Sequence, residues 1–181
     1  MKKKWIPLIL TAFIVLIDQI TKALIVHYLP IAPGARISES VNVLGDFLRF
    51  THIRNTAILF SLGDELSPLL KLIFFVIIPS LLLILLVVYY FRSREIKKAH
   101  RWIIAGILGG GIGNMLDRII RTGGVVDFID VKFFGIFGMN RWPTFNLADS
   151  SIVISAIILI IFLLIEEFIS LKKGKTHEQE N

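Results

Sequence analysis

A stretch of 20 consecutive residues without a charge, Leu72–Phe91, sets the first limit on the fold of this chain. An α-helix of that length spans the hydrocarbon core of a lipid bilayer, which is about 30 Å thick. Pro79 lies inside the stretch, but neighbouring helices can supply partners for the backbone group that a proline leaves unpaired. The stretch therefore predicts a membrane-spanning helix.

Three further apolar stretches each run into charged residues near one end, and a hydropathy window still predicts four spans. The predicted spans are approximately 5–29, 69–91, 101–121 and 149–171. Only 19% of the residues are charged and the mean hydropathy is +0.74, values that exclude a disordered chain and argue against a water-soluble globule. We therefore expect an all-α membrane protein with four transmembrane helices, formed as a single domain over residues 1–181.

Basic residues orient these spans. Eleven of the 20 Lys and Arg residues lie in three short segments, 2–4, 92–101 and 172–175. The positive-inside rule places these segments, and with them both termini, in the cytoplasm, so that segments 30–68 and 122–148 face the other side. The net charge of +6 is thus explained by topology and contact with anionic lipid, and we expect no nucleic-acid partner.

The first 23 residues could instead form a cleaved signal peptide, because a Lys-rich start precedes an apolar stretch. Asp18 and Lys22 lie near its far end, and no small-residue cleavage site precedes Leu29. These features favour a retained helix.

The two external segments differ in composition. Val41–Phe60 is rich in β-branched and aromatic residues and lies among turn signals such as Pro33-Gly34 and Gly63, so we expect a small sheet of short strands on the outer surface. Segment 122–148 is rich in Gly and Phe.

Polar residues of two predicted helices fall at one depth of the membrane. A rise of 1.5 Å per residue places Asp18 and Lys22, and likewise Asn114, Asp117 and Arg118, in the outer third of the bilayer. A lipid-exposed Asp or Lys at a helix centre costs about 2.5–3.5 kcal/mol, so such residues normally turn inward and pair. They form either structural ion pairs, Asp18 with Lys22 and Asp117 with Arg118, or part of a functional site.

Glycines crowd the third predicted span. The spacings Gly106–Gly110 and Gly109–Gly113 both fit close packing between helices. They could equally let a substrate backbone approach, but packing is the preferred interpretation.

Two carboxylates beside outer helix ends could perform chemistry. Asp127 follows the third span and Asp149 begins the fourth. If they meet, they cannot both ionise cheaply, so one holds a proton and the pair supplies an acid and a base for peptide hydrolysis. Alternatively, Asp149 is a charge favoured by a helix N-terminus, Asp127 is a loop carboxylate, and Asp130 competes for any role.

Catalysis or metal binding by cysteine or histidine has no support in the sequence. The chain contains no cysteine, which excludes a thiolate nucleophile, a cysteine-ligated zinc and an iron–sulfur cluster. The four histidines lack the spacing of a helical metal site. We expect neither a metal nor another cofactor.

Four motifs together resemble those of lipoprotein signal peptidase, the bacterial signal peptidase II family of four-span aspartic proteases. The motifs are Asp18-Gln19-Ile20-Thr21-Lys22, Gly109–Arg118, Val125-Val126-Asp127-Phe128 and Phe145–Asp149. Their order and spacing cover nearly the whole chain. The resemblance implies a bacterial inner-membrane enzyme with its active site at the extracytoplasmic face, and it identifies segment 42–60 with the β-sheet that the family calls a cradle.

The resemblance also implies residue roles and partners. Asp127 and Asp149 would form the catalytic dyad, and seven residues would support the dyad or bind substrate: Asp18, Lys22, Asn55, Gly110, Asn114, Arg118 and Asn146. The substrate would be a prolipoprotein whose cysteine carries a diacylglyceryl group, cleaved just before that cysteine. Membrane lipid would surround the enzyme, the cyclic peptide globomycin would block the dyad, and we expect a monomer.

One motif departs from the family. The first outer loop usually reads Asn-x-Gly-Ala-Ala-Phe, whereas this chain reads Asn55-Thr56-Ala57-Ile58-Leu59-Phe60. Ala57 replaces a glycine and disfavours a positive φ, and the two bulkier residues after it change the pocket shape beside Asn55.

Two other functions fit some of these features. A small proton- or ion-coupled transport subunit would use intramembrane Asp, Lys and Arg, but the chain shows no internal repeat or broken-helix pair. A divalent-metal hydrolase would need oxygen ligands only, from Asp18, Asp117, Asp127 and Asp149. Sensitivity to chelators would separate it from a carboxylate dyad.

Overall fold

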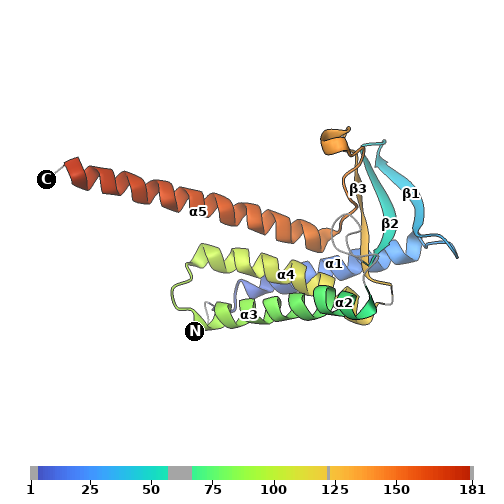
Figure 1. The fold of residues 1–181 in the computed structure, drawn as a ribbon, viewed down its shortest axis with the longest axis horizontal. Helices are drawn as coiled ribbons and strands as arrows, with labels where there is room; N and C mark the ends of the chain where they lie inside the picture. The colour runs from blue at the N-terminus through green and yellow to red at the C-terminus, as the bar shows by residue number, and fades with distance from the viewer. Residues whose placement is uncertain (1–3, 57–66, 122, 180–181) are drawn as a thin grey trace.

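The computed structural model describes residues 4–56, 67–121 and 123–179 (Figure 1). The order of elements is α1 (Leu8–Tyr28), β1 (Ile37–Leu44), β2 (Leu48–Asn55), α2 (Pro68–Leu72), η3 (Ile73–Ile77), α3 (Ile78–Arg92), α4 (Lys98–Ile120), β3 (Val125–Val131), η4 (Ile136–Gly138) and α5 (Leu147–Gln179). The substituted loop residues Ala57–Leu59, and the end of the predicted strand region, lie outside the described residues.

Four long apolar helices lie where the sequence predicts spans. Helices long and apolar enough to cross a membrane cover Leu8–Tyr28, Pro68–Arg92, Lys98–Ile120 and Leu147–Lys172. The third of these is the most buried, whereas the second and fourth expose large apolar side chains such as Leu85 and Leu164. Such exposed apolar surfaces suit the hydrocarbon of a membrane. The burial of α4 places it at the centre of the bundle.

The second span is one helix built from α2, η3 and α3. Its π-helical turn, Ile73–Ile77, lies directly before Pro79. A proline lacks the backbone N–H that continues an α-helical ladder, and a wider turn is a common way to accommodate the break. The span thus crosses without ending at the proline.

The glycines of α4 allow its neighbours to approach closely, as the packing interpretation predicted. A β-carbon at Gly109 would lie 2.9 Å from Cβ of Ile14 in α1, and one at Gly110 would overlap the carbonyl oxygen of Ala148 in α5. At Gly113 it would lie 2.7 Å from Oδ2 of Asp18. Close packing of α4 against both helices therefore depends on small residues.

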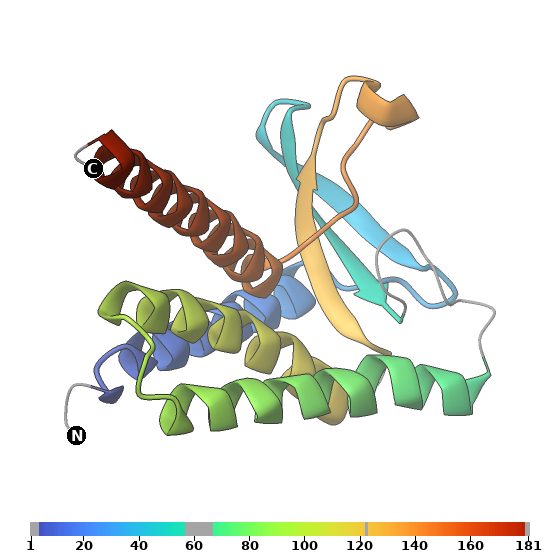
Figure 2. The same cartoon turned by 60° about the vertical axis from the view of Figure 1, so that its left-hand side comes forward.

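The sheet has three antiparallel strands in the order β1-β2-β3. The sequence analysis assigned strands to the first external segment only, so β3 in segment 122–148 was missed. The Val-rich β3 pairs with β2, with Asn55 opposite Val125 and Ile53 opposite Asp127. Ile25 of α1 packs on Val126 and Phe128, which fixes β3 to the bundle. The strands run across the ends of the helices (Figures 1 and 2).

Candidate active site

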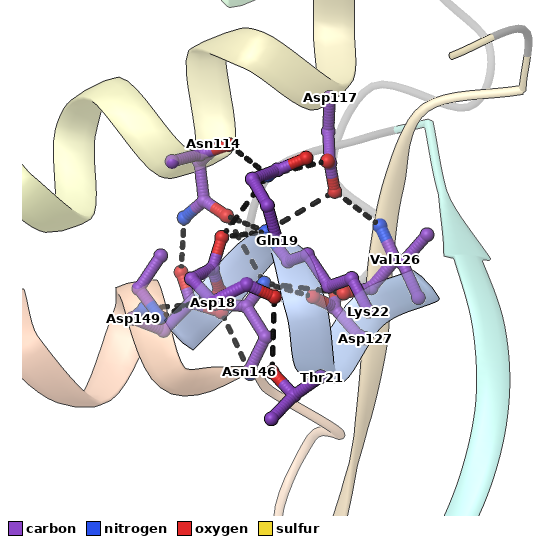
Figure 3. Close-up of polar contacts among 12 residues, drawn as sticks. Asp18, Gln19, Thr21, Lys22, Asn114, Asp117, Val126, Asp127, Asn146 and Asp149 are labelled. Carbon is purple, nitrogen blue, oxygen red and sulfur yellow. Dashed lines mark hydrogen bonds and ion pairs between the residues drawn. The ribbon is translucent and has the colours of Figure 1, made fainter. Parts of the chain in front are cut away.

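The predicted site residues come from β2, β3, α1, α4 and the start of α5, and most of them meet where β3 and α5 reach the bundle (Figure 3). Asp127 lies on β3 and is only 3% exposed. Its Oδ1 accepts a hydrogen bond from Nδ2 of Asn146 at 2.7 Å, and its Oδ2 accepts one from Nδ2 of Asn55 at 2.8 Å. Burial, and after it the charge of Asp149, raises the pKa of Asp127 to about 7.

Asp149 lies in the first turn of α5 and takes part in a reciprocal cap. The side chain of Asn146 accepts from the backbone N–H of Asp149 at 2.9 Å, and Oδ2 of Asp149 accepts from the backbone N–H of Asn146 at 3.1 Å. This is the geometry of a capping box, in which the side chain of each residue accepts a hydrogen bond from the backbone N–H of the other. Oδ1 of Asp149 accepts from Nδ2 of Asn114 at 2.7 Å. Helix capping therefore fixes the Asp149 carboxylate.

Asn146 joins the two carboxylates. Its side-chain nitrogen binds Asp127, while its backbone N–H and side-chain oxygen bind Asp149. The same nitrogen also lies 3.0 Å from Oδ1 of Asn114, and the residue is fully buried. One residue thus holds a side chain from a strand and a side chain from a helix in a fixed relation.

Beneath this pair lies an ion cluster formed by Asp18, Lys22 and Asp117, all fully buried. The Nζ atom of Lys22 lies 2.9 Å from Oδ2 of Asp18 and 3.1 Å from Oδ2 of Asp117. It also donates to Oδ1 of Asn114 at 2.9 Å. The predicted pairing of Asp18 with Lys22 is confirmed, and the cluster reaches the dyad through one asparagine.

The two carboxylates of this cluster also bind the backbone. Oδ1 of Asp18 accepts from the N–H of Ala148 at 3.0 Å, and Oδ2 of Asp117 accepts from the N–H of Val126 at 3.0 Å (Figure 3). Ala148 directly precedes Asp149, and Val126 directly precedes Asp127. The lysine therefore stabilises two carboxylates, each of which holds the chain one residue before a dyad member.

Asp117 pairs with residues other than Arg118, which the sequence offered as one alternative. Asp117 binds Lys22, and it also binds Arg121 at 3.0 Å, because residues four apart share a helix face whereas adjacent residues do not. Arg118 is half-buried and lies within electrostatic range of Asp149, Asp127 and Asp117. It lines a small cavity of about 230 Å³ together with Asn55 and Phe75.

Asp130 does not join the site. It binds Arg49 at 2.8 Å and forms a further ion pair with Arg141, near the other end of β3. Its role as a competitor for Asp127 is therefore not supported by its contacts. A larger groove of about 1320 Å³ runs along the sheet and is lined by Asp127, Asn55 and Arg54, among other residues.

The described residues contain no group of three or more His, Asp or Glu side chains suited to a metal ion. Two of the four carboxylates considered for a metal, Asp18 and Asp117, face the ammonium group of Lys22. A cation between them would meet a like charge, so the geometry opposes the metal alternative.

The sequence reasoning missed two supporting features. Gln19 donates from Nε2 to Oδ1 of Asp117 at 3.0 Å and to the carbonyl of Gly113 at 3.1 Å, which ties α1 to α4. The capping box was readable in the sequence, because Asn146 precedes an acidic residue by three positions. Gln19 carried no comparable signal, since a glutamine in the middle of a helix has many possible roles.

Comparisons with known proteins show which family the chain resembles. Residues 10–165 match the Peptidase_A8 family, described as signal peptidase (SPase) II. The chain is 44% identical to the lipoprotein signal peptidase of Treponema pallidum (strain Nichols), over 92% of this chain and 87% of that protein. It is 47% identical to that of Treponema denticola, over 84% of each. A solved bacterial membrane enzyme is 34% identical and superimposes with a TM-score of 0.72, covering 89% of this chain and 88% of that one.

Proposed function

This chain belongs to the signal peptidase II family, and from that premise we propose that Asp127 and Asp149 cleave the signal peptide from prolipoproteins by aspartic-protease chemistry. The observation that carries the proposal is the link through Asn146, which binds one carboxylate on β3 and another on α5. Hydrolysis with two carboxylates requires such a pair, with a single proton shared between them.

The raised pKa of Asp127 supports its assignment as the proton carrier. Protonated Asp127 donates a hydrogen bond to the carbonyl oxygen of the scissile peptide, while ionised Asp149 takes a proton from water. The hydroxide attacks the carbonyl carbon, and the tetrahedral intermediate collapses as the proton on Asp149 passes to the leaving amide nitrogen. The apparent pKa values of this reaction belong to the pair.

The other residues hold this pair ready. Asn55 and Asn114 each donate to one carboxylate, and Gly110 lets the first turn of α5 approach α4. Arg118 lies within electrostatic range of both aspartates and opposes the negative charge of the intermediate. Asp18 and Lys22 act one step further away, through the backbone at Ala148 and through Asn114.

We infer that the substrate carries a diacylglyceryl group on its cysteine and is cut just before it. Acyl chains in the outer leaflet would hold the scissile bond at the membrane surface, with each buried CH₂ adding about 0.8 kcal/mol of apolar binding. The site lies where the helices meet the sheet, which supports a position at that level (Figure 1). A cyclic peptide such as globomycin would compete for the same groove.

The proposed topology has both termini in the cytoplasm of a bacterium and the sheet outside its inner membrane. Lys4 donates to the carbonyl of Phe91 at 3.0 Å, so the first two basic segments share one end of the bundle. The site lies at the other end, beside the sheet (Figure 1). A reporter fused after residue 98 should remain cytoplasmic and one after residue 135 should be external, and the reverse result would contradict this topology.

The test of the mechanism is cleavage of a lipidated precursor by the purified protein in detergent. Asp127→Asn and Asp149→Asn should each abolish turnover while the melting temperature stays within a few degrees. Asp46→Asn, at an exposed carboxylate in the β1–β2 turn, is the matched control and should remain active. Near wild-type activity of either dyad variant, or inhibition by a chelator, would refute the assignment. We propose a monomer as the active form, which activity at high dilution would support.

A further inference from the structure

The loop between the two aspartates exposes large apolar side chains. Between β3 and α5, Phe134 is 68% exposed, Ile136 is 50% exposed and Phe137 is 85% exposed. Phe47, from the neighbouring β1–β2 turn, stacks on Phe134 with ring centroids 6.2 Å apart. Isolated exposed apolar residues are ordinary, but a contiguous group at a loop tip indicates a binding surface.

The backbone holds these side chains in place. The N–H of Phe133 donates to the carbonyl of Asn140 at 2.8 Å, and that of Gly135 donates to Met139 at 3.0 Å. Phe134 and Phe137 both have a positive φ, of 55° and 52°, which costs energy for a residue with a bulky side chain. The loop is thus a closed turn that keeps its rings outward, at a conformational cost that burial of those rings would offset.

The position of the loop indicates what covers it. The strands run across the helices, and in both views the loop lies at the end of the sheet far from α1, α3 and α4 (Figures 1 and 2). In Figure 1 the orange turn that contains η4 lies on the same side of the strands as the helices. Because apolar side chains cover the outer faces of those helices, a membrane around the bundle would bring lipid beneath this overhang.

The polar residues of the loop also suit a membrane surface. Lys132 lies over the ring of Phe134, with Nζ 5.7 Å from the centroid, and Trp142 packs on Phe133 at 4.9 Å. Trp beside Lys or Arg is the composition of the headgroup region, where amphipathic rings and cations both find partners.

We propose that residues 133–142, here called the aromatic loop, insert into the lipid headgroup and acyl boundary on the sheet side of the membrane. The loop leads from β3, which carries Asp127, to α5, which carries Asp149. Its insertion sets the height of the strand above the lipid and so aligns the dyad with a bond that lies at the surface. The insertion itself rests on the helices spanning a membrane, whereas the alignment of the dyad also rests on the proposed function.

The cysteine-free chain permits a direct test. Phe137→Cys, labelled with an environment-sensitive fluorophore, is reconstituted into nanodiscs of phosphatidylethanolamine and phosphatidylglycerol that carry shallow nitroxide quenchers. The matched control is Glu39→Cys on β1, an exposed position close by register to the Asp127 end of the sheet. We expect the label at 137 to be quenched about threefold more strongly than the label at 39, with a blue-shifted emission.

Two results would overturn the proposal. Equal quenching of both labels would place the aromatic loop in water. A blue shift that depends on protein concentration at constant lipid, without quenching, would assign the loop to contact with a second copy. A melting temperature close to that of the wild-type protein checks that the labelled protein is folded. Quenching of the label, together with no cleavage of a lipidated precursor by the unlabelled wild-type protein in the same nanodiscs, would refute the peptidase mechanism while leaving insertion supported.

Discussion

Two clusters of ion pairs lie at opposite ends of the sheet and differ in what they hold. The inner cluster is formed by Asp18, Lys22 and Asp117, whose side chains are fully buried. The tip cluster is formed by Asp46, Arg49, Asp130, Lys132 and Arg141, whose side chains are between 7% and 58% exposed. Ion pairs of the same residue types are therefore shielded from solvent in the inner cluster and accessible to solvent in the tip cluster.

The difference shows how burial turns an ion pair into a structural constraint. In the inner cluster each carboxylate binds a backbone N–H next to a dyad residue, and no water competes. In the tip cluster, Asp46 is shared by Lys132, Arg49 and Arg141, and solvent can replace any one of them. The inner cluster specifies the site, whereas the tip cluster ties the β1–β2 turn to the chain that follows β3.

The largest expected effect follows from removing the inner cation. Lys22→Met removes the ammonium partner of Asp18 and leaves Asp117 with Arg121. Breaking a buried pair in this way costs about 3–5 kcal/mol. We expect the protein to unfold at a much lower temperature in detergent and to lose its activity, and Asp18→Asn in the same background should restore part of the stability. Wild-type stability of Lys22→Met would show that the two clusters do not differ in energy.

A smaller effect is expected from a substitution that keeps the helix-capping role of Asn146 but removes its hydrogen bond to Asp127. Asn146→Ser keeps a good helix N-cap, so the melting temperature should change little, but it removes the side-chain nitrogen that binds Asp127. We expect the cleavage rate to fall about 100-fold, the loss associated with a misplacement near 1 Å. Asn146→Ala is the control that loses both functions and should also melt earlier. An active Asn146→Ser variant would contradict the bridging role.

The parts of the fold that depend on hydropathy and helix periodicity could be predicted from the sequence. Four spans, the buried pairing of Asp18 with Lys22 and the glycine packing of α4 follow from hydropathy and helix periodicity. β3 was missed because its side chains are nearly all buried, so it lacks the alternation that marks a strand with one wet face. The partner of Asp117 was missed because Lys22 lies 95 residues away, and only the packing of α1 on α4 brings them together.

The proximity of the dyad was likewise beyond the sequence alone. Asp127 and Asp149 lie in different elements, and spacing did not distinguish Asp127 from Asp130. Pairing of β3 with β2 makes the distinction, since it sets Asp127 opposite Ile53 and Asp130 opposite Arg49. Only Asp127 then receives hydrogen bonds from both Asn55 and Asn146.

The dependence of stability on pH should differ between a carboxylate at the inner end of the sheet, Asp127, and one at its tip, Asp46. Because the pKa of Asp127 is raised to about 7, the folded state holds a proton that the unfolded state releases, and the free energy of unfolding should fall as pH rises from about 4 to 7. Lys132 lowers the pKa of Asp46, so its contribution has the opposite sign and is lost only as pH falls through the acid range.

The dependence of the cleavage rate on pH should also reflect the protonation of Asp127. The cleavage rate should decrease about tenfold per pH unit above the pKa of the proton carrier. The hydrogen bond from Asn55 lowers the pKa of Asp127, so Asn55→Ala should move this limb to higher pH. If the decline in cleavage rate at high pH begins at the same pH in Asn55→Ala as in the wild type, another group carries the proton.

The smallest effect is expected at the tip. Lys132→Gln removes an exposed partner of Asp46, but Arg141 remains within 3.2 Å of the same carboxylate. Exposed pairs contribute little because solvent screens them, so the melting temperature should stay within about 1 °C of wild type and activity in detergent should be unchanged. The comparison with Lys22→Met is then direct, since each substitution removes one ammonium group from a pair of similar length. A large loss from Lys132→Gln would mean that the sheet transmits changes at its tip to the dyad.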